Sequence, residues 1–456
     1  MIQPSGRSVV LVVMDSARRD AFGPHTPNLW DLGERGIRFD RAIAPAGWTL
    51  PSHVSMFTGL KPTEHRVTGL TGGAEKVLAN ARRRMLTMSK DGVLLAPVLR
   101  EHGIATRSAS ASPWVTAASG LDAGFDETDF FNFLQTNRAR RAKSSLPKRV
   151  RQSLDTLRSV RDHAEWLRAG RDKGAARVLA GLDRFIGETK GPFFAFTTLM
   201  DTHEPHVSPV RPHGWYRRHL PETLNTVLQP GIVRILRLHG HNWGVLPVPN
   251  RLIERWRRAY EEEIAYLDRW LGSLLETLDG RGRLDETTII VTADHGETWN
   301  ENGMIGHGIS LREGLANVPL VLCGAGVGQT GTVAQPVSLS GIGATVRKLL
   351  LDTADVTLLD ERGRGFATME MEDPKEVAHR PRLARREARG PGVAIYDGDL
   401  KLVADPFAER ELQLFDLSTD PDETTDLIGT HTPTPRQTVE LDEWRARTGT
   451  HAETRA

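Results

Sequence analysis

Cysteine is almost absent from this chain, since Cys323 is the only one among 456 residues. A single thiol excludes an intramolecular disulfide framework. Because Cys323 follows a strand-like run at residues 318–322, we expect it to be a small buried side chain. With 39% hydrophobic residues, a chain of this length can bury a large core without cross-links.

The sequence also lacks an excess of charge and a long apolar run. Lysine and arginine number 59 against 58 aspartate and glutamate residues, so no net field favours nucleic acid or anionic lipid. No apolar run approaches the roughly 20 residues of a membrane-spanning helix. The run at 8–14 has no signal-peptide cleavage site after it. We expect a cytoplasmic protein that binds a small molecule, with neither nucleic acid nor membrane as a partner; the sequence makes no prediction of oligomeric state.

Strand-like and helix-like segments alternate along most of the chain. The apolar runs at 8–14, 192–198 and 287–293 have the composition of buried strands. Helical periodicity at 175–186 and 252–278 places helices between them. This order predicts an α/β fold with a doubly wound, mostly parallel sheet flanked by helices.

The pattern changes towards the C-terminus. Short strand candidates at 393–396, 401–404 and 411–416 are separated by turn residues, which predicts a small antiparallel sheet followed by a helix. We therefore expect a catalytic α/β unit over residues 1–370 and a C-terminal unit over residues 371–456.

Two segments of the larger unit have unusual composition. Residues 138–173 hold twelve Lys and Arg, and we expect a basic insertion at about 136–174. It is either a solvated helical segment or a patch that attracts a polyanionic substrate. The segment at about 206–250 is rich in Pro, His, Trp and Arg. We interpret it as a lid-like loop that determines substrate specificity.

Ionisable residues follow the predicted strands directly. Asp15 ends the strand at 8–14, Asp294 and His295 follow the strand at 287–293, and Thr49 lies on a turn after an extended segment. Open α/β sheets bind ligands at the carboxyl ends of their strands. We therefore predict a divalent-metal site formed by Asp15, Asp294, His295 and Thr49, with Thr49 as the nucleophile on the metal. One ion of Mn²⁺, Mg²⁺, Ca²⁺ or Zn²⁺ fits such a ligand set.

Three more histidines, His53, His203 and His307, follow predicted strand ends or neighbour glycines. Each is a candidate to contact an anionic substrate or to protonate its leaving oxygen. A single histidine is more often an ordinary core or surface residue, so the prediction rests on the joint placement of the three at strand ends. Ser112, in the loop after the predicted strand at 105–110, is a further candidate for substrate binding.

Motifs spread over nearly the whole chain resemble the sulfatase family of the alkaline phosphatase superfamily. These motifs are Asp15-Ser16 with Asp20, Thr26-Pro27-Asn28-Leu29, Trp48-Thr49-Leu50-Pro51-Ser52-His53, Met200-Asp201-Thr202-His203-Glu204-Pro205-His206, Asp294-His295-Gly296-Glu297 and Gly306-His307-Gly308. The resemblance implies an alkaline-phosphatase-like fold and a metal bound by Asp15, Asp294 and His295. It also implies a nucleophile at position 49, substrate contacts from His203 and His307, and a role in the nucleophile motif for His53.

The chain departs from the family pattern in ways that affect the expected substrate. Sulfatases carry Cys or Ser at the nucleophile position and convert it to formylglycine, which Thr49 cannot become. Ser16 replaces a second metal-binding Asp, and the Lys and His expected after the fourth strand are missing at 110–114. Family relatives with Thr at this position act on phosphorus.

We therefore expect hydrolysis of phosphate or phosphonate esters, or phosphoryl transfer, through a covalent Thr49 intermediate. The alternatives are sulfate ester hydrolysis with an unusual nucleophile and a non-catalytic metal-binding protein. Bimetallic relatives carry an additional Asp and His about one helical turn apart. Asp201 and His206 do not have that spacing, so we expect one metal.

Overall fold

The structure is a computed structural model that describes residues 4–69, 73–131, 172–210, 238–360, 365–377 and 384–450. Almost all of the predicted basic insertion and the central part of the predicted lid-like segment lie outside these residues.

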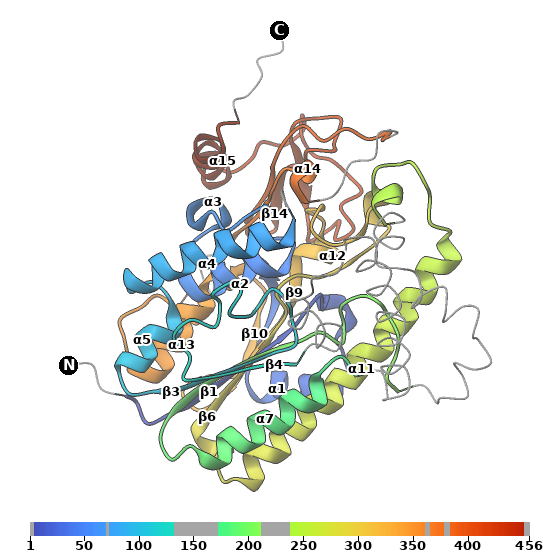
Figure 1. Ribbon diagram of the computed structural model, residues 1–456. Helices are drawn as coiled ribbons and strands as arrows, with labels where there is room; N and C mark the ends of the chain where they lie inside the picture. The colour runs from blue at the N-terminus through green and yellow to red at the C-terminus, as the bar shows by residue number, and fades with distance from the viewer. Residues whose placement is uncertain are drawn as a thin grey trace, which may run out of the picture.

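Within the described residues, the largest sheet has nine strands in the order β10-β2-β9-β6-β1-β5-β3-β4, with β11 beside β2 (Figure 1). Its strands are β1 (Ser8–Met14), β2 (Ile37–Ile43), β3 (Ala105–Ser110), β4 (Glu127–Phe130), β5 (Phe193–Leu199), β6 (Thr287–Thr292), β9 (Asn317–Gly324), β10 (Gly331–Val333) and β11 (Val337–Ser338). β1 pairs in parallel with both β5 and β6. β9 is antiparallel to β2 and β6. Every residue of β1, β5 and β6 is buried, as expected for strands covered on both faces.

Helices cover both faces of this sheet (Figure 1). On one face lie α1 (Pro27–Arg35), α7 (Ala175–Glu188) and α11 (Asn250–Gly280); on the other lie α2 (Thr49–Thr58), α5 (Leu95–Glu101) and α13 (Ile342–Leu351). Short or peripheral helices are α3 (Pro62–His65), α4 (Ala74–Lys90), α12 (Glu313–Ala316) and α14 (Pro374–Val377). The predicted doubly wound α/β architecture is confirmed.

The C-terminal residues form a second, antiparallel sheet, also as predicted. Its strands are β12 (Phe366–Met371), β13 (Gly392–Asp397), β14 (Leu400–Ala404) and β15 (Gln413–Asp416), and α15 (Pro435–Thr448) follows. Alternate residues of β13 face opposite ways: Val393 and Ile395 pack with α15, whereas Ala394 and Tyr396 pack towards the large sheet. Residue 370 falls within β12; a C-terminal unit that begins near this point remains our prediction.

A buried lysine connects the C-terminal sheet to the loop before α12. Lys401 on β14 is fully buried, and its Nζ donates to Leu311 O at 2.7 Å. The same ammonium group lies 2.8 Å from carboxylate oxygens of Glu313 and Glu423. Because Leu311 and Glu313 follow His307 closely in the chain, this contact fixes the C-terminal sheet against the loop that carries a candidate site residue.

The sequence prediction was wrong or incomplete at several elements. The helix predicted from residue 52 begins at Thr49; α4, β4 and β12 were not predicted. Thr49 was expected on a turn before the helix, but it begins the helix, and Pro51 lies in the first helical turn, where its missing N–H costs no hydrogen bond.

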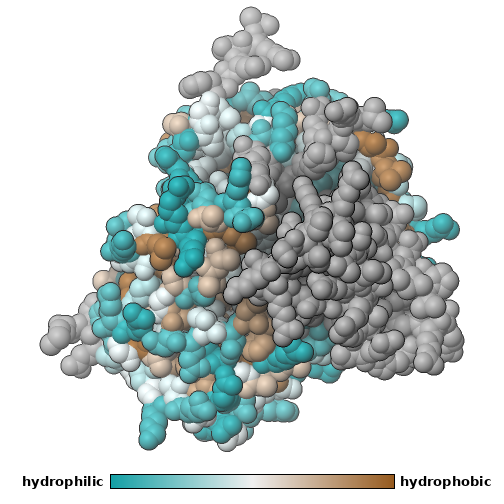
Figure 2. Space-filling view, in the orientation of Figure 1, coloured by the Kyte–Doolittle hydropathy of each residue, from teal (hydrophilic) through white to brown (hydrophobic). Residues whose placement is uncertain are grey.

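No described helix is both long and apolar enough to cross a membrane. On the face shown in Figure 2, hydrophobic side chains are scattered among polar ones. Such scattered exposure is ordinary for a folded chain.

Acid sensitivity is expected from His65 in α3. Val67 N–H donates to His65 Nδ1 at 3.0 Å, so the buried ring is neutral and carries its proton on Nε2, near Ser55 Oγ. Burial lowers the pKa of His65 to about 3. As pH falls below the unfolded-state pKa of about 6.5, the unfolded chain binds a proton that the folded chain does not. This residue should therefore lower the free energy of unfolding by about 2 kcal/mol between about pH 7.5 and pH 5.

Denaturant unfolding of the wild type and His65→Asn at both pH values measures this contribution. Asparagine keeps an acceptor for Val67 N–H and cannot titrate, so its stability should change less with pH. Parallel pH profiles for the two proteins would contradict the prediction.

Candidate active site

Thr49 is the first residue of α2, immediately after the extended segment that leaves β2. Its side-chain Oγ1 donates to Asp15 Oδ2 at 3.3 Å. The free N–H groups of a helix N-terminus surround this position, which favours a bound anion. Thr49 is only 3% exposed, so the hydroxyl has a fixed orientation towards the end of β1.

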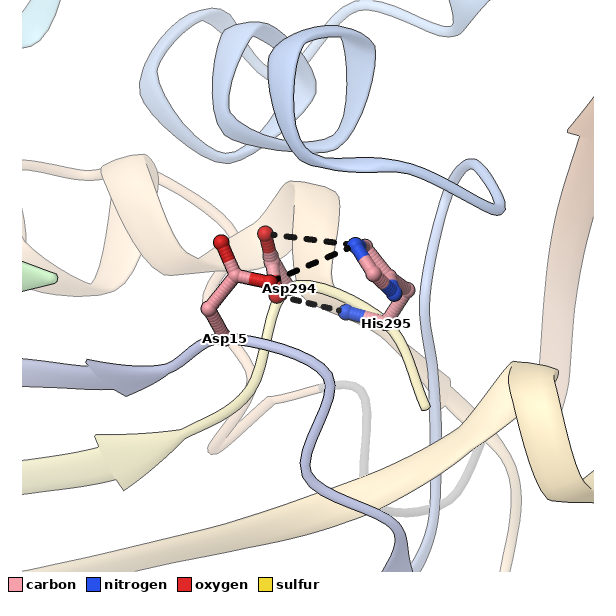
Figure 3. Close-up of side chains that lie close together, drawn as sticks. All are labelled: Asp15, Asp294 and His295. Carbon is pink, nitrogen blue, oxygen red and sulfur yellow. Dashed lines mark hydrogen bonds and ion pairs between the residues drawn. The ribbon is translucent and has the colours of Figure 1, made fainter. Parts of the chain in front are cut away.

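Asp15, Asp294 and His295 converge from the ends of β1 and β6 (Figure 3). Their ligating atoms all lie within 4.8 Å of one another. His295 Nε2 lies 3.7 Å from Asp15 Oδ1 and 3.6 Å from Asp294 Oδ2. Within the described part of the chain, this is the group of side chains that could share one metal ion.

The orientation of these groups fits a cation. His295 Nδ1–H donates to Gly296 O at 2.8 Å, which leaves the lone pair of Nε2 directed at the carboxylates. Among the described residues, neither His295 Nε2 nor Asp294 Oδ2 has a hydrogen-bond partner, although both are buried. Unpartnered buried acceptors are costly unless an ion satisfies them. Two acids and one neutral imidazole therefore match a divalent metal.

Electrostatics of the three groups agree with this. Burial, together with the charge of Asp294, raises the pKa of Asp15 to about 7. Burial also raises the pKa of Asp294 and lowers that of His295, the latter to about 4. Burial of the two carboxylates thus disfavours their negative charges, which a cation would stabilise.

Backbone contacts hold the ligands in place. Ser16 has φ of 65°, a left-handed conformation that is uncommon for serine. This conformation directs Ser16 N–H to Asp294 Oδ1 at 3.2 Å, and Ser16 Oγ donates to Asp15 Oδ1 at 3.1 Å. Ser16, which replaces the second metal-binding Asp of the family pattern, thus donates a hydrogen bond to the first, Asp15. A Cβ on Gly296 would lie 2.1 Å from Gly314 O, so the loop after His295 requires glycine.

His307 and His203 lie next to this group. The ring of His307 is 4.7 Å from that of His295 and 4.9 Å from that of His203, between centroids. His307 Nδ1 contacts Glu297 Oε2 at 3.2 Å. Burial lowers the pKa of His307, but the Glu297 carboxylate outweighs it and raises the value to about 9. The Glu297 carboxylate thus favours the protonated form of His307, which could donate a proton.

The other two predicted residues are placed differently. His53 lies one helical turn after Thr49, with Nδ1 donating to Thr49 O at 2.8 Å and Nε2 3.2 Å from Thr198 Oγ1. Both ring nitrogens are thus used inside the protein, behind Thr49. Ser112 is buried, and its Oγ accepts from Trp114 N at 3.4 Å. Within the described residues, the structure does not bring Ser112 into hydrogen-bond contact with the histidines or Thr49.

Sequence reasoning missed the residues that support the site. Glu297 is the counter-ion of His307, Ser52 Oγ donates to Asp294 O at 2.6 Å, and Thr202 Oγ1 donates to Asp15 O at 2.6 Å. Glu297 could have been found as an acid in the same strand-end loop as Asp294. The other two bind backbone atoms, which leave no signal in residue type or spacing.

Comparisons with known proteins give one consistent result. The family model described as "Sulfatase" matches residues 7–353. A choline-sulfatase of Rhizobium meliloti is 34% identical over 179 residues, which cover 38% of this chain and 33% of that protein. A multifunctional alkaline phosphatase superfamily protein of Trinickia caryophylli is 22% identical over 70% of this chain and 68% of its own length. The crystal structure of the phosphonate monoester hydrolase of Agrobacterium radiobacter superposes with a TM-score of 0.62 at 20% identity, covering 98% of this chain and 96% of that one.

Proposed function

The chain belongs to the sulfatase family, and from that premise we propose that it is a metal-dependent hydrolase of phosphate or phosphonate esters that uses Thr49 as its nucleophile. One observation carries this proposal. Thr49 Oγ1, at the N-terminus of α2, lies 3.3 Å from Asp15 Oδ2 beside the unpartnered Asp294 Oδ2 and His295 Nε2. Such a group of ligands and a hydroxyl suits displacement at a tetrahedral anion.

Asp15, Asp294 and His295 would hold one divalent ion, whose identity among Mn²⁺, Mg²⁺, Ca²⁺ and Zn²⁺ is open. When bound, it would neutralise negative charge on the ester and favour ionisation of the Thr49 hydroxyl. The free N–H groups of the first turn of α2 would contact the oxygens of the anion. His203 would face the same anion beside His307.

The reaction has two displacements. Thr49 Oγ would lose its proton to solvent and form a bond to phosphorus while the bond from phosphorus to the leaving oxygen breaks, and His307 would supply the proton of that oxygen. Neutral His307 would then take a proton from water as the water oxygen attacks phosphorus, and the bond to Thr49 Oγ would break with return of a proton to Thr49. With an acceptor alcohol in place of water, the same steps amount to phosphoryl transfer.

Thr49 favours phosphorus over sulfur as the site of attack. A threonine has no route to the formylglycine hydrate through which sulfatases release sulfate, whereas a phosphothreonine can be cleared by water. The phosphonate monoester hydrolase that superposes on this chain is named for a phosphorus ester, which supports this choice. The second candidate is sulfate ester hydrolysis, which the choline-sulfatase favours through its higher identity of 34%.

Side-by-side assays distinguish the candidates. The purified chain is assayed with Mn²⁺, Mg²⁺, Ca²⁺ and Zn²⁺ in turn, on 4-nitrophenyl esters that are a phosphate monoester, a phosphodiester, a phosphonate and a sulfate. We expect faster release of nitrophenol from one of the phosphorus esters than from the sulfate. Cleavage of the sulfate alone would establish the second candidate, and no turnover with any of the four divalent metals would support a non-catalytic protein.

His307→Asn is expected to lower kcat by roughly 10²- to 10⁴-fold, as for loss of a general acid. The loss should grow as the leaving group becomes a poorer one, because a poor leaving group depends most on protonation. Rates for a series of aryl esters with graded phenol pKa values measure this. An equal loss for every leaving group would contradict the assignment of His307 as the acid.

A further inference from the structure

A buried polar cluster lies beneath the loop at residues 201–207, which carries His203. We define the Lys173 cluster as Lys173, Asp201, His206 and Glu263. Lys173 and Asp201 are 1% exposed, and Glu263 is fully buried. Neither Lys173 nor Glu263 contacts the candidate metal ligands directly, and the steps proposed for the reaction do not use them.

Lys173 binds the backbone on both sides of Thr202. Its Nζ donates to Asp201 O at 2.9 Å and to His203 O. Its own N–H donates to Asp201 Oδ1 at 2.9 Å. One buried side chain therefore fixes the carbonyl group of His203 itself and that of the residue two positions before it.

Glu263 on α11 completes the cluster. Its Oε1 accepts from Val207 N at 2.7 Å and lies 3.3 Å from Lys173 Nζ, and its Oε2 lies 2.9 Å from His206 Nδ1. The three N–H bonds of the Lys173 ammonium group are thus matched by three acceptors, two of them backbone carbonyls of one loop. Burial, together with Asp172, raises the pKa of Asp201 to about 8. Glu263 is the carboxylate that forms an ion pair with Lys173.

Among the described residues, the Lys173 cluster contacts the loop after β5, which carries His203, and not the strand ends that carry the metal ligands. The candidate metal ligands come from the ends of β1 and β6, whereas the loop at 201–207 follows β5. One helical turn before Glu263, Tyr260 OH accepts from Arg18 N and donates to Ser16 O. α11 therefore holds the loop after β1 through Tyr260 and the loop after β5 through Glu263.

The loop at 201–207 also contacts Asp15, since Thr202 Oγ1 donates to Asp15 O at 2.6 Å. That contact is to the backbone, whereas Ser16 Oγ binds the carboxylate, Asp15 Oδ1, from the β1 side. Loss of the Lys173–Glu263 pair should therefore move His203 and leave the metal-ligating side-chain atoms in place.

We propose that Lys173 and Glu263 are positioning residues that hold His203 opposite His307 for the transition state. This inference rests on the proposed function, because it assigns His203 a contact with the reacting anion. A buried ion pair is weak evidence for a purely stabilising role, because the desolvation of its two charges offsets their attraction. Here the charge-assisted bonds converge on the backbone of the residue to be positioned.

A double-mutant cycle tests the proposal. Lys173→Met and Glu263→Gln are each made in the wild type and in His203→Ala, and kcat and KM are measured with whichever 4-nitrophenyl ester the wild type cleaves fastest. In the wild-type background we expect a loss of roughly 10- to 100-fold in kcat/KM, mainly in kcat, as for a displaced catalytic group. In the His203→Ala background we expect no further loss. Titration calorimetry should show unchanged affinity for Mn²⁺.

Arg107→Met is the matched control. Arg107 is a fully buried cation on β3 whose partners, Glu127 and Asp129, lie on β4. The Arg107→Met variant should be destabilised as Lys173→Met is, but it should keep the wild-type kcat. If Lys173→Met does not fold, Glu263→Gln carries the test, because glutamine preserves the shape of the side chain.

Two results would overturn the inference in distinguishable ways. Equal losses with and without His203 would show that the cluster acts independently of this residue. Wild-type kinetics for His203→Ala would remove the anion contact assigned to His203, and with it both the proposed role of His203 and that of the cluster.

Discussion

Replacing Thr49 by alanine is expected to reduce turnover by roughly 10⁴-fold or more while metal binding persists. The three candidate ligands are unchanged in this variant, and Thr49 Oγ1 is the hydroxyl that contacts one of them, Asp15, at 3.3 Å. Ser52 cannot take its place, because the proton of Ser52 Oγ is donated to Asp294 O at 2.6 Å. Rate and bound Mn²⁺ are measured on the same preparations.

Two further variants complete this test. Thr49→Ser keeps a hydroxyl and should retain a measurable rate. Thr58→Ala removes the threonine hydroxyl at the other end of α2, which donates to Val54 O at 2.6 Å, and should turn over like the wild type. Mass spectrometry of acid-quenched wild type should find the phosphoryl group on residue 49. A Thr49→Ala variant with a near-normal rate would exclude Thr49 as the nucleophile.

Replacing Asp294 by asparagine should have opposite effects on stability with and without metal. Burial raises the pKa values of Asp15 and Asp294, and the charge of Asp294 raises that of Asp15 further, so removal of one charge should leave the metal-free protein at least as stable as the wild type. With metal at about 1,000 times its Kd, the wild type should gain about 4 kcal/mol and the variant almost none. Turnover should be lost together with metal binding. Thermal unfolding in chelator and in Mn²⁺ measures both effects.

Asp268→Asn is the control for a buried carboxylate of the opposite kind. Both oxygens of Asp268 accept hydrogen bonds at the start of α1, from Leu29 N at 2.9 Å and from Asn28 N at 3.2 Å. Asparagine should therefore destabilise the protein in either condition, and the gain from metal should remain. If Asp294→Asn behaves in the same way as this control, Asp294 is not a metal ligand.

The elements that could be predicted from sequence are the strands that are buried on both faces of the sheet, such as β1 and β6. The β-branched runs of β1 and β6 allow no other interpretation once their length is considered. β4 is largely exposed, and α4 buries only Val77, Ala81, Met85 and Met88. Tertiary position determined β4, whereas the buried residues of α4 recur at helical spacing, a signal that our prediction overlooked.

The candidate site also has parts that could be predicted from sequence and parts that could not. Asp15 and the pair Asp294–His295 could be predicted to converge, because strands of one parallel sheet end at one edge. The sequence could not show that the His53 side chain hydrogen-bonds to Thr49 O, or that Ser112 Oγ accepts a hydrogen bond from Trp114 N. It also could not show that α11 carries anchors for two loops, since contacts between a side chain and a distant backbone depend on the packing of the whole helix.

The position of β1 at the centre of the sheet has a consequence for biosynthesis. Val9 pairs with Phe194 on one side and with Thr288 on the other, so the first strand leaves the ribosome long before either neighbour exists. At about 5–20 residues per second, roughly ten to forty seconds pass before β5 is translated. During that interval a wholly apolar segment with both edges open is available to other nascent chains. High-level production of this protein should therefore depend on chaperones that bind extended hydrophobic segments near the N-terminus.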